Sequence, residues 1–436
     1  MNPHRLPAVA AALWICVTAA RAQAPSPAEI AALYPDLSAL YRDLHQNPEL
    51  GFQEKQTSAK LAARLQPLGY QVTTGVGRTG VVAILRNGAG PVVMLRTELD
   101  ALPVEEKTGA AFASRATTKN DAGQTVPVMH ACGHDLHMSA WAGTAQWMAE
   151  HRDRWRGTLM LVGQPAEEGG RGAAALLGDG LFERFPKPAF ALSLHDDDTM
   201  PSGTIGYHAG IFRATSTTVS LTVIGRGGHG AMPHNTVDPV VLAARVVLSL
   251  QTIVSRENNP IDPVVITVGS IHGGTQANVI PDEVTLEISV RAFSEDVRQR
   301  LLAAIARVAK AEAQAAGAPR EPRVEVRGGT TNPVYNDPAL IQRLSIALKK
   351  TMGADRVMEM PAKMTSEDFS AYGRAGVPSA LLHIGAVAPG KLADSKRTGV
   401  PVPAPHSPEW LPDLETTLKA AVLAETSALL DLFGGK

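Results

Sequence analysis

Short apolar runs alternate with helical stretches along most of the chain. The runs at 81–85, 92–95, 159–162 and 190–194 have the length and apolar character of buried strands, and a helical stretch at 138–150 precedes the third run. Continuously apolar strands between helices are typical of a mainly parallel sheet that is covered by helices. The sequence therefore predicts an α/β fold.

The character of the chain changes near Gly210 and changes back after Tyr335. Between these points, strands and helices are expected in the order β-α-β-β-α-β, which is typical of a ferredoxin-like α+β domain. The sequence thus predicts a catalytic domain in two pieces, 25–211 and 329–436, with a smaller domain, 212–328, inserted between them. The elements expected in the insertion are strands at 216–224, 264–271, 284–290 and 324–326, a helix that begins at Asp238-Pro239, and a helix over 295–316.

Residues 1–24 have the pattern of a signal peptide. Arg5 precedes an apolar run at 8–20 that is too short to anchor the chain in a bilayer, and Ala22-Gln23-Ala24 forms an A-x-A cleavage site. We therefore expect an exported protein, periplasmic or secreted, with no membrane attachment after cleavage. A membrane-anchored N-terminal helix is the alternative. The net charge of −1 and the lack of a basic stripe give no reason to expect a nucleic-acid partner.

Cys132 would be the only cysteine after cleavage, because Cys16 lies in the apolar run. A lone thiol in an oxidising compartment needs protection, and metal ligation would provide it. Cys132 lies in the segment His130-Ala131-Cys132-Gly133-His134-Asp135-Leu136-His137, just before a helical stretch. A thiolate beside imidazoles favours a transition metal such as zinc, or manganese in a mixed site.

Further polar groups follow the apolar runs. Glu167 and Glu168 close the run that begins at Leu159, and His195 closes the next one. Adjacent side chains on an extended segment point in opposite directions, so one carboxylate could bind a metal while the other faces a water. His406 lies in a loop before the last helix and would, on its own, be interpreted as a surface histidine.

Together these residues belong to motifs that resemble the M20 metallopeptidase family, and within it the aminoacylase and hippurate-hydrolase-like amidohydrolase branch. The motifs run over almost the full mature length, and their order and number make the resemblance specific. It implies an α/β metal domain with an inserted ferredoxin-like lid, and often a homodimer that pairs through the lid. The matching segments are 42–49, 99–103, 129–137, 164–170, 227–234, 273–274, 278–281, Arg291, 366–369 and 405–406.

The resemblance also implies roles for single residues. Glu167 matches the general base, and His229 matches a histidine that reaches the scissile carbonyl, in many relatives from the partner subunit. Asn278 and Arg291 match lid residues that hold the substrate or its carboxylate, and Asp100 matches a residue that orients a ligand from behind. A pair of divalent ions per subunit, zinc or manganese with cobalt as a further candidate, would be held by Cys132, His134, Glu168, His195 and His406.

One departure from the family pattern and one unusual run of acids stand near these residues. Glu98 occupies a position, two before Asp100, where this branch usually has an aspartate. The charge is kept and the side chain is one methylene longer. Three successive acids, Asp196–Asp198, follow His195 and are expected to add negative charge beside the metals.

The predicted activity is hydrolysis of the amide bond of N-acyl or N-aroyl amino acids, which gives a carboxylic acid and a free amino acid. A metal-activated water would attack, with Glu167 as general base. The alternatives are a dipeptidase or metallocarboxypeptidase of the same family, and a non-catalytic metal-dependent binding protein, which the intact Glu167 disfavours. A thiol hydrolase is disfavoured too, because Cys132 and His134 are too close in sequence for a nucleophile–base pair.

Overall fold

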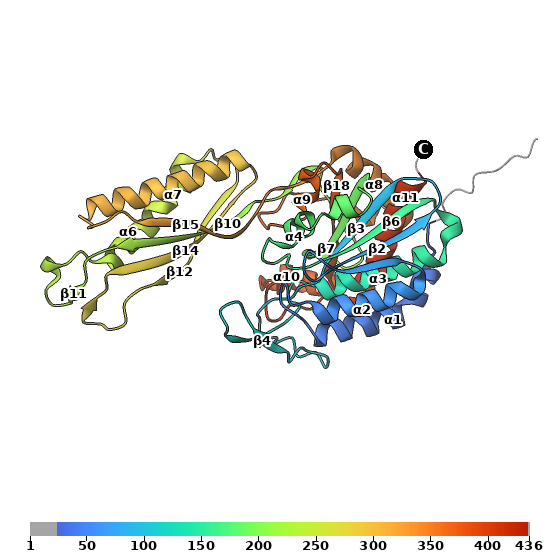
Figure 1. Ribbon diagram of the computed structural model, residues 1–436, viewed down its shortest axis with the longest axis horizontal. Coiled ribbons are helices and arrows are strands. Elements are labelled where there is room, and N and C mark those ends of the chain that lie inside the picture. The colour runs from blue at the N-terminus through green and yellow to red at the C-terminus, as the bar shows by residue number, and fades with distance from the viewer. Residues whose placement is uncertain (1–23, 435–436) are drawn as a thin grey trace, which may run out of the picture.

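Two separate sheets divide the protein into a large domain and a small domain that projects from it (Figure 1). The computed structural model describes residues 24–434. Except for Ala24, the predicted signal peptide therefore lies outside the described residues. The small domain comprises residues 216–331, and the chain on both sides of it builds the large domain.

The large domain is built on an eight-stranded sheet. Its strands are β1 (Gln71–Val76), β2 (Gly80–Asn87), β3 (Val92–Glu98), β6 (Gly157–Gln164), β7 (Phe190–Pro201), β8 (Ile205–Tyr207), β17 (Val357–Glu359) and β18 (Ser379–Val387). Their order in the sheet is β1-β2-β6-β3-β7-β18-β8-β17. The pairs β6–β3, β3–β7 and β7–β18 at the centre are parallel, whereas β1 and β2 join one edge in antiparallel fashion. The predicted mainly parallel sheet is confirmed.

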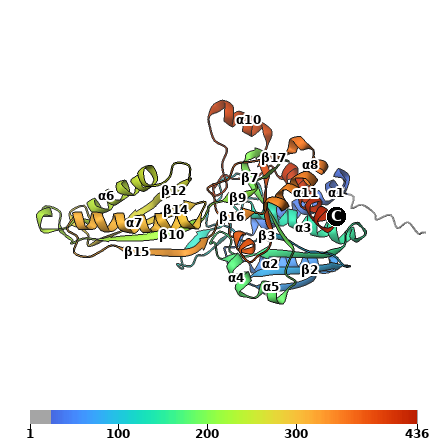
Figure 2. The ribbon, with the colours of Figure 1, turned by 90° about the horizontal axis from the view of Figure 1, so that it is seen from above.

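Helices cover both faces of this sheet (Figure 2). Along β6, Leu159 and Leu161 belong to the core on one face, and Met160 and Val162 to the core on the other, which explains why the strand is apolar without alternation. The first face carries α1 (Pro27–Gln46), α2 (Lys55–Leu65), α3 (His134–Glu150), α8 (Pro338–Met352) and α11 (Leu414–Phe433), and the second carries α4 (Gly172–Gly178), α5 (Leu181–Arg184) and α9 (Ser370–Arg374).

The small domain is a four-stranded antiparallel sheet with two helices on one face. Its elements are β10 (Ser216–Ile224), α6 (Pro239–Thr252), β12 (Val264–His272), β14 (Glu283–Ala292), α7 (Glu295–Ala315) and β15 (Arg323–Thr331). The sheet order β12-β14-β10-β15 is the ferredoxin-like order, so this expectation is confirmed. Alternate residues of β14, from Val284 to Val290, are buried beneath the helices. The segment Pro239–Glu257 is long and apolar enough to cross a membrane, but its inner face packs on the sheet.

Short elements complete the structure. They are β4 (Thr117–Lys119) with β5 (Thr125–Pro127), β9 (Gly210–Arg213) with β16 (Val334–Asn336), β11 (Gly228–His229) with β13 (Val279–Ile280), and helix α10 (Pro389–Thr398). Two predicted elements are longer than expected. Helix α3 already begins at His134, and β7 continues through Asp196–Asp198 to Pro201. The side chains of Asp196 and Asp197 find hydrogen-bond partners inside the fold, which allows the strand to continue.

Glu425 on α11 provides a test of the packing. Its side chain is buried and accepts a hydrogen bond from the Thr144 hydroxyl at 2.7 Å. Burial raises the pKa of Glu425 to about 8. In the unfolded chain the pKa of a glutamate is ~4.3. Between this pH and pH 8 the folded state holds a proton on Glu425 that the unfolded state has lost. The free energy of unfolding therefore falls as the pH rises through this range. Glu425→Gln should therefore raise the melting temperature by several degrees at pH 8, and by much less at about pH 5.

The control is Glu415→Gln on the same helix, because this residue is exposed and pairs with Lys419. It should leave the melting temperature almost unchanged at both pH values, as measured by scanning calorimetry. An equal rise in melting temperature at both pH values for Glu425→Gln would contradict a raised pKa of Glu425.

Candidate metal centre

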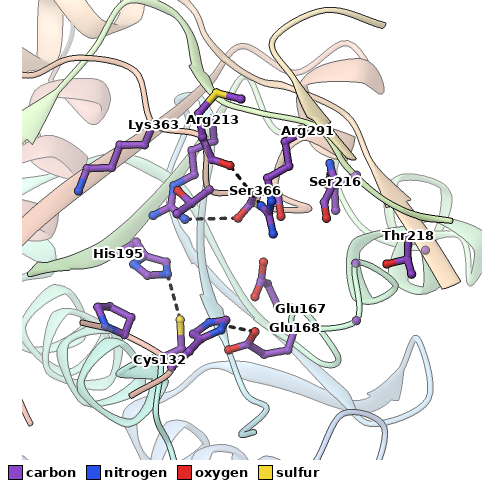
Figure 3. A pocket seen from close by; sticks show the side chains of 18 of the residues that line it. Cys132, Glu167, Glu168, His195, Arg213, Ser216, Thr218, Arg291, Lys363 and Ser366 are labelled. Carbon is purple, nitrogen blue, oxygen red and sulfur yellow. Dashed lines mark hydrogen bonds and ion pairs between the residues drawn. The ribbon is translucent and has the colours of Figure 1, made fainter. Parts of the chain in front are cut away.

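The predicted metal ligands lie together at the carboxyl ends of the central strands, beside a cavity of about 800 Å³ (Figure 3). Ligands of open α/β sheets commonly bind at this edge. The large domain contributes Cys132, Glu168 and His195 to the cavity wall, and the small domain contributes Arg291 and Thr218. The site therefore lies between the two domains.

A tight turn brings the first ligands together. Gly133 has φ 73°, and a Cβ at this position would lie 2.3 Å from the Asp196 carboxylate. Only glycine adopts this conformation without a clash, and it permits the turn that joins Cys132 to His134. The Cys132 Sγ lies 3.6 Å from His195 Nε2, and the ligand atoms of Cys132, His134 and His195 lie within 4.8 Å of one another.

A second group of ligands shares Cys132. The Nε2 of His406 lies 3.4 Å from Glu168 Oε2, and the ligand atoms of Cys132, Glu168 and His406 also lie within 4.8 Å of one another. His406 has a positive φ of 72°, and its backbone N–H donates to the Ala131 carbonyl at 2.7 Å. This bond fixes the loop before α11 against the cysteine segment. Two overlapping groups that share one thiolate offer places for a pair of ions.

Two of these ligand atoms have no hydrogen-bond partner among the described residues, although both are buried. They are His134 Nε2 and Glu168 Oε1, which lie 4.0 Å apart. Leaving such atoms unpaired costs free energy, which a bound cation would recover. The Nδ1 of His134 faces the Asp100 carbonyl at 2.7 Å, so Nδ1 carries the proton and Nε2 presents its lone pair. Thiolate, imidazole and carboxylate donors fit zinc and related divalent ions.

Asp100 positions the cluster from behind. Its carboxylate accepts hydrogen bonds from the backbone N–H groups of Glu167 and Glu168, both at 3.0 Å, and its carbonyl accepts the one from His134. A single residue thus orients an imidazole and the backbone that carries two carboxylates.

Glu167 and Glu168 do not lie on an extended segment, and that expectation is wrong. Strand β6 ends before them, and residues 167–170 form a turn after Ala166, whose φ is 48°. Both carboxylates line the cavity as a result. Burial and the carboxylates of Glu367 and Glu168 raise the pKa of Glu167 well above its ordinary value.

A layer of buried charges lies beneath the ligands. The His137 Nε2 accepts a hydrogen bond from the Asp196 N–H at 2.8 Å, and its Nδ1 faces Glu98 at 3.1 Å. Glu98 also pairs with Arg96. The longer side chain of Glu98, at the position where the resemblance expects aspartate, contacts both Arg96 and His137.

His229 and Asn278 lie away from the cavity in a single chain. His229 ends β11 and Asn278 directly precedes β13, and both residues are exposed. The Gly230 N–H donates to the Asn278 carbonyl at 2.8 Å. Figure 1 shows β11 at the end of the small domain farthest from the large sheet. Within one chain, Asn278 is therefore separated from Arg291 by the length of the small domain, so the two residues cannot hold one substrate together.

Arg291 does line the cavity, and it donates to the Met364 carbonyl at 3.2 Å. Three further cations of the cavity wall, Arg213, Arg327 and Lys363, are not among the residues predicted from the sequence. A single arginine or lysine gives no local signal in the sequence. The sequence offers only an indirect hint, the acids Asp196–Asp198, whose second member pairs with Lys363.

Comparison with known proteins gives consistent matches to one family. Residues 94–400 match the model of "Peptidase family M20/M25/M40". An N-acetyl-L-cysteine deacetylase from Bacillus subtilis (strain 168) is 38% identical over 63% of this chain, and the match spans 64% of that relative. A hippurate hydrolase from Campylobacter jejuni is 34% identical over 79% of this chain and 86% of its own.

Among solved structures, a dinuclear metal binding peptidase of the M20 family from Bacillus subtilis superposes with a TM-score of 0.71. Its sequence identity is 26%, and the match covers 92% of this chain and 99% of that chain. The large domain, the small domain and their connection thus correspond to a solved protein that binds a pair of metals.

The role of Asp100 can be tested by metal affinity. In Asp100→Asn, one carboxylate oxygen becomes an NH₂ group that cannot accept a backbone N–H. The turn with Glu167 and Glu168 should loosen, and metal affinity should fall by roughly 10–100-fold. Titration of the metal-free protein against a competing chelator measures this. Asp121→Asn, a change at an exposed acid, is the control and should titrate like the wild type. Equal affinity in both variants would exclude this role.

Proposed function

The chain belongs to peptidase family M20/M25/M40, and from this premise we propose that it is a metal-dependent amidohydrolase that cleaves N-acyl or N-aroyl amino acids to a carboxylic acid and a free amino acid. The relatives named N-acetyl-L-cysteine deacetylase and hippurate hydrolase support this substrate class. The observation that carries the proposal is a buried Glu167 beside the ligand cluster, with Arg291 lining the same cavity.

Glu167 is the proton carrier of the proposed reaction. When bound, divalent ions supply an activated water and polarise the amide carbonyl. Glu167, whose Oε2 lies 3.9 Å from His134 Nε2, accepts the proton of the attacking water. It then donates this proton to the amide nitrogen as the C–N bond breaks. A carboxyl with a raised pKa holds the proton between the two steps.

Arg291 is proposed to bind the carboxylate of the amino acid that leaves. Its guanidinium has no ion pair with a carboxylate of the described chain, and burial lowers its pKa. A guanidinium binds a carboxylate through two parallel hydrogen bonds, which fixes the orientation of the substrate. For the ions, we propose zinc or manganese, with cobalt as a further candidate, because the ligand set mixes sulfur, nitrogen and oxygen.

We also propose a homodimer in which the partner supplies His229 and Asn278, since one chain keeps them far from its own cavity. The small domain has features of an interface. Strand β12 is an edge strand, and Val241, Leu248 and Ile271 are exposed on α6 and β12. Export, inferred from residues 1–24, stays part of the proposal.

Substitution of Glu167 tests the reaction. Glu167→Gln should lower kcat for an N-benzoyl or N-acetyl amino acid by about 10²–10⁴-fold, because the base is lost. Metal content, measured by atomic emission, should stay the same. Glu183→Gln, on the exposed side of α5, is the matched control and should be fully active. Normal turnover by the Glu167 variant would exclude it as the base, and no release from any N-acyl amino acid by the metal-loaded wild type would refute the proposed function.

Mixing two inactive variants tests the proposed dimer. His229→Ala and Glu167→Gln should each be nearly inactive. In a mixed dimer, one site has Glu167 from the first variant and His229 from the second. Co-expression should therefore restore up to about a quarter of wild-type activity if half of the dimers are mixed. Without a gain over the separate variants, His229 would not act across subunits.

A further inference from the structure

Arg213 is a buried cation without a carboxylate partner among the described residues. It ends β9 and is 4% exposed. Its guanidinium contacts the His383 Nε2 at 2.9 and 3.3 Å and the Ser366 carbonyl at 3.4 Å. Burying a guanidinium costs several kcal/mol unless an anion compensates it. The direct partners of Arg213 are an imidazole and a carbonyl, which are neutral, and the Glu367 carboxylate nearby already pairs with Arg96.

Arg96 shows how the same fold treats a buried arginine with a structural role. It is 1% exposed and contacts three carboxylates, those of Glu98, Glu367 and Asp368. Its charge is therefore fully matched inside the protein. Arg213 has a similar burial but lines the cavity instead, so its charge is open to a ligand.

The His383 imidazole holds Arg213 in place and is itself held by Asp197. The His383 Nδ1 faces Asp197 at 2.6 Å, and Asp197 also pairs with Lys363. The proton of His383 therefore lies on Nδ1, and Nε2 accepts from Arg213. Burial and the charge of Arg213 lower the pKa of His383 to about 3, which keeps this imidazole neutral. The Asp197 carboxylate is used by His383 and Lys363, so it does not neutralise Arg213.

The cavity thus has an acidic side and a basic side. Figure 3 shows Cys132 and Glu168 on one side, and Arg213 and Arg291 across the cavity from them. When the scissile carbonyl of a substrate binds at the ligand cluster, the other groups of that substrate face the basic side. The two arginines found there have no carboxylate partner within residues 24–434.

We propose that Arg213 binds a carboxylate of the substrate and selects N-acyl amino acids that carry a second carboxylate. The inference rests on the proposed function, in which Arg291 binds the carboxylate of the leaving amino acid. The second carboxylate belongs either to the amino-acid side chain or to a dicarboxylic acyl group. Both offer the same planar anion to the guanidinium.

Two matched substrate pairs test the inference. N-acetylglutamate and N-acetylglutamine have the same shape and differ by one charge on the amino-acid side. N-succinylvaline and its terminal amide differ in the same way on the acyl side. Calorimetry on zinc-loaded Glu167→Gln protein measures binding without turnover, and kcat/KM of the wild type is measured alongside. In one pair at least, the charged member should bind about tenfold or more tightly than the neutral one.

Arg213→Met should bring the ratio of the affinities for the charged and the neutral member of a pair close to one. For the calorimetry this change is combined with Glu167→Gln. Arg213→Lys should give an intermediate ratio, since a lysine keeps the charge but not the fork. The control is Arg327→Met, which removes a charge from the same cavity wall. Arg327 is exposed and already pairs with Glu287 and Glu325, so its loss should keep the ratio.

The outcomes separate the role of Arg213 from the proposed function. The substrate pair whose two members differ in affinity shows on which side of the amide Arg213 lies. Equal binding within both pairs, or a ratio that survives Arg213→Met, overturns the inference even if the enzyme hydrolyses N-acyl amino acids. If Arg213→Met does not fold, the wild-type ratios and Arg213→Lys still decide. Absence of both binding and hydrolysis overturns the proposed function as well.

Discussion

Negative charge buried at the carboxyl ends of the central strands is the constraint on which the rest of the large domain depends. Glu98, Glu367 and Asp196 are almost completely inaccessible, and each needs a cation or hydrogen-bond donors. Arg96 pairs with Glu98 and Glu367, and the His137 Nδ1 faces Glu98, so part of this charge is compensated inside the protein. At the cavity, two buried metal-ligand atoms, His134 Nε2 and Glu168 Oε1, have no hydrogen-bond partner in the described chain. The fold itself therefore creates the demand that a bound metal satisfies.

Sequence reasoning succeeded where the signal is local. The apolar run before Glu167 predicts a strand that ends at the site, and the alternation in the inserted segment predicts its sheet. Cys132 and His134 stand out because thiolate and imidazole donors are rare neighbours. Arg213 gave no such signal, since its importance comes from what it lacks among the described residues, a carboxylate in ion-pair contact. That property exists only once His383 and Ser366 are placed beside it.

The turn at Glu167 and Glu168 shows a second limit. Strand periodicity predicts opposite directions for two adjacent carboxylates, but periodicity ends with the strand. Here Asp100, far away in sequence, accepts both backbone N–H groups and sets the conformation. In the same way, nothing in the motif around His229 says that it lies at the tip of the small domain. The fold class thus follows from local patterns, whereas the geometry of the site depends on contacts between distant segments.

The acids Asp196–Asp198 illustrate how one strand connects the two sides of the cavity. Asp196 turns towards His137 and accepts the Trp410 indole N–H at 3.0 Å, whereas Asp197 turns the other way to His383. The parallel pairing of β7 and β18 places His383 directly opposite His195. A slip of one residue in this register would exchange the faces of Asp196 and Asp197. The ligand cluster would then lose its supporting acid at the same time as Arg213 lost its support, so metal binding and anion binding depend on the same strand register.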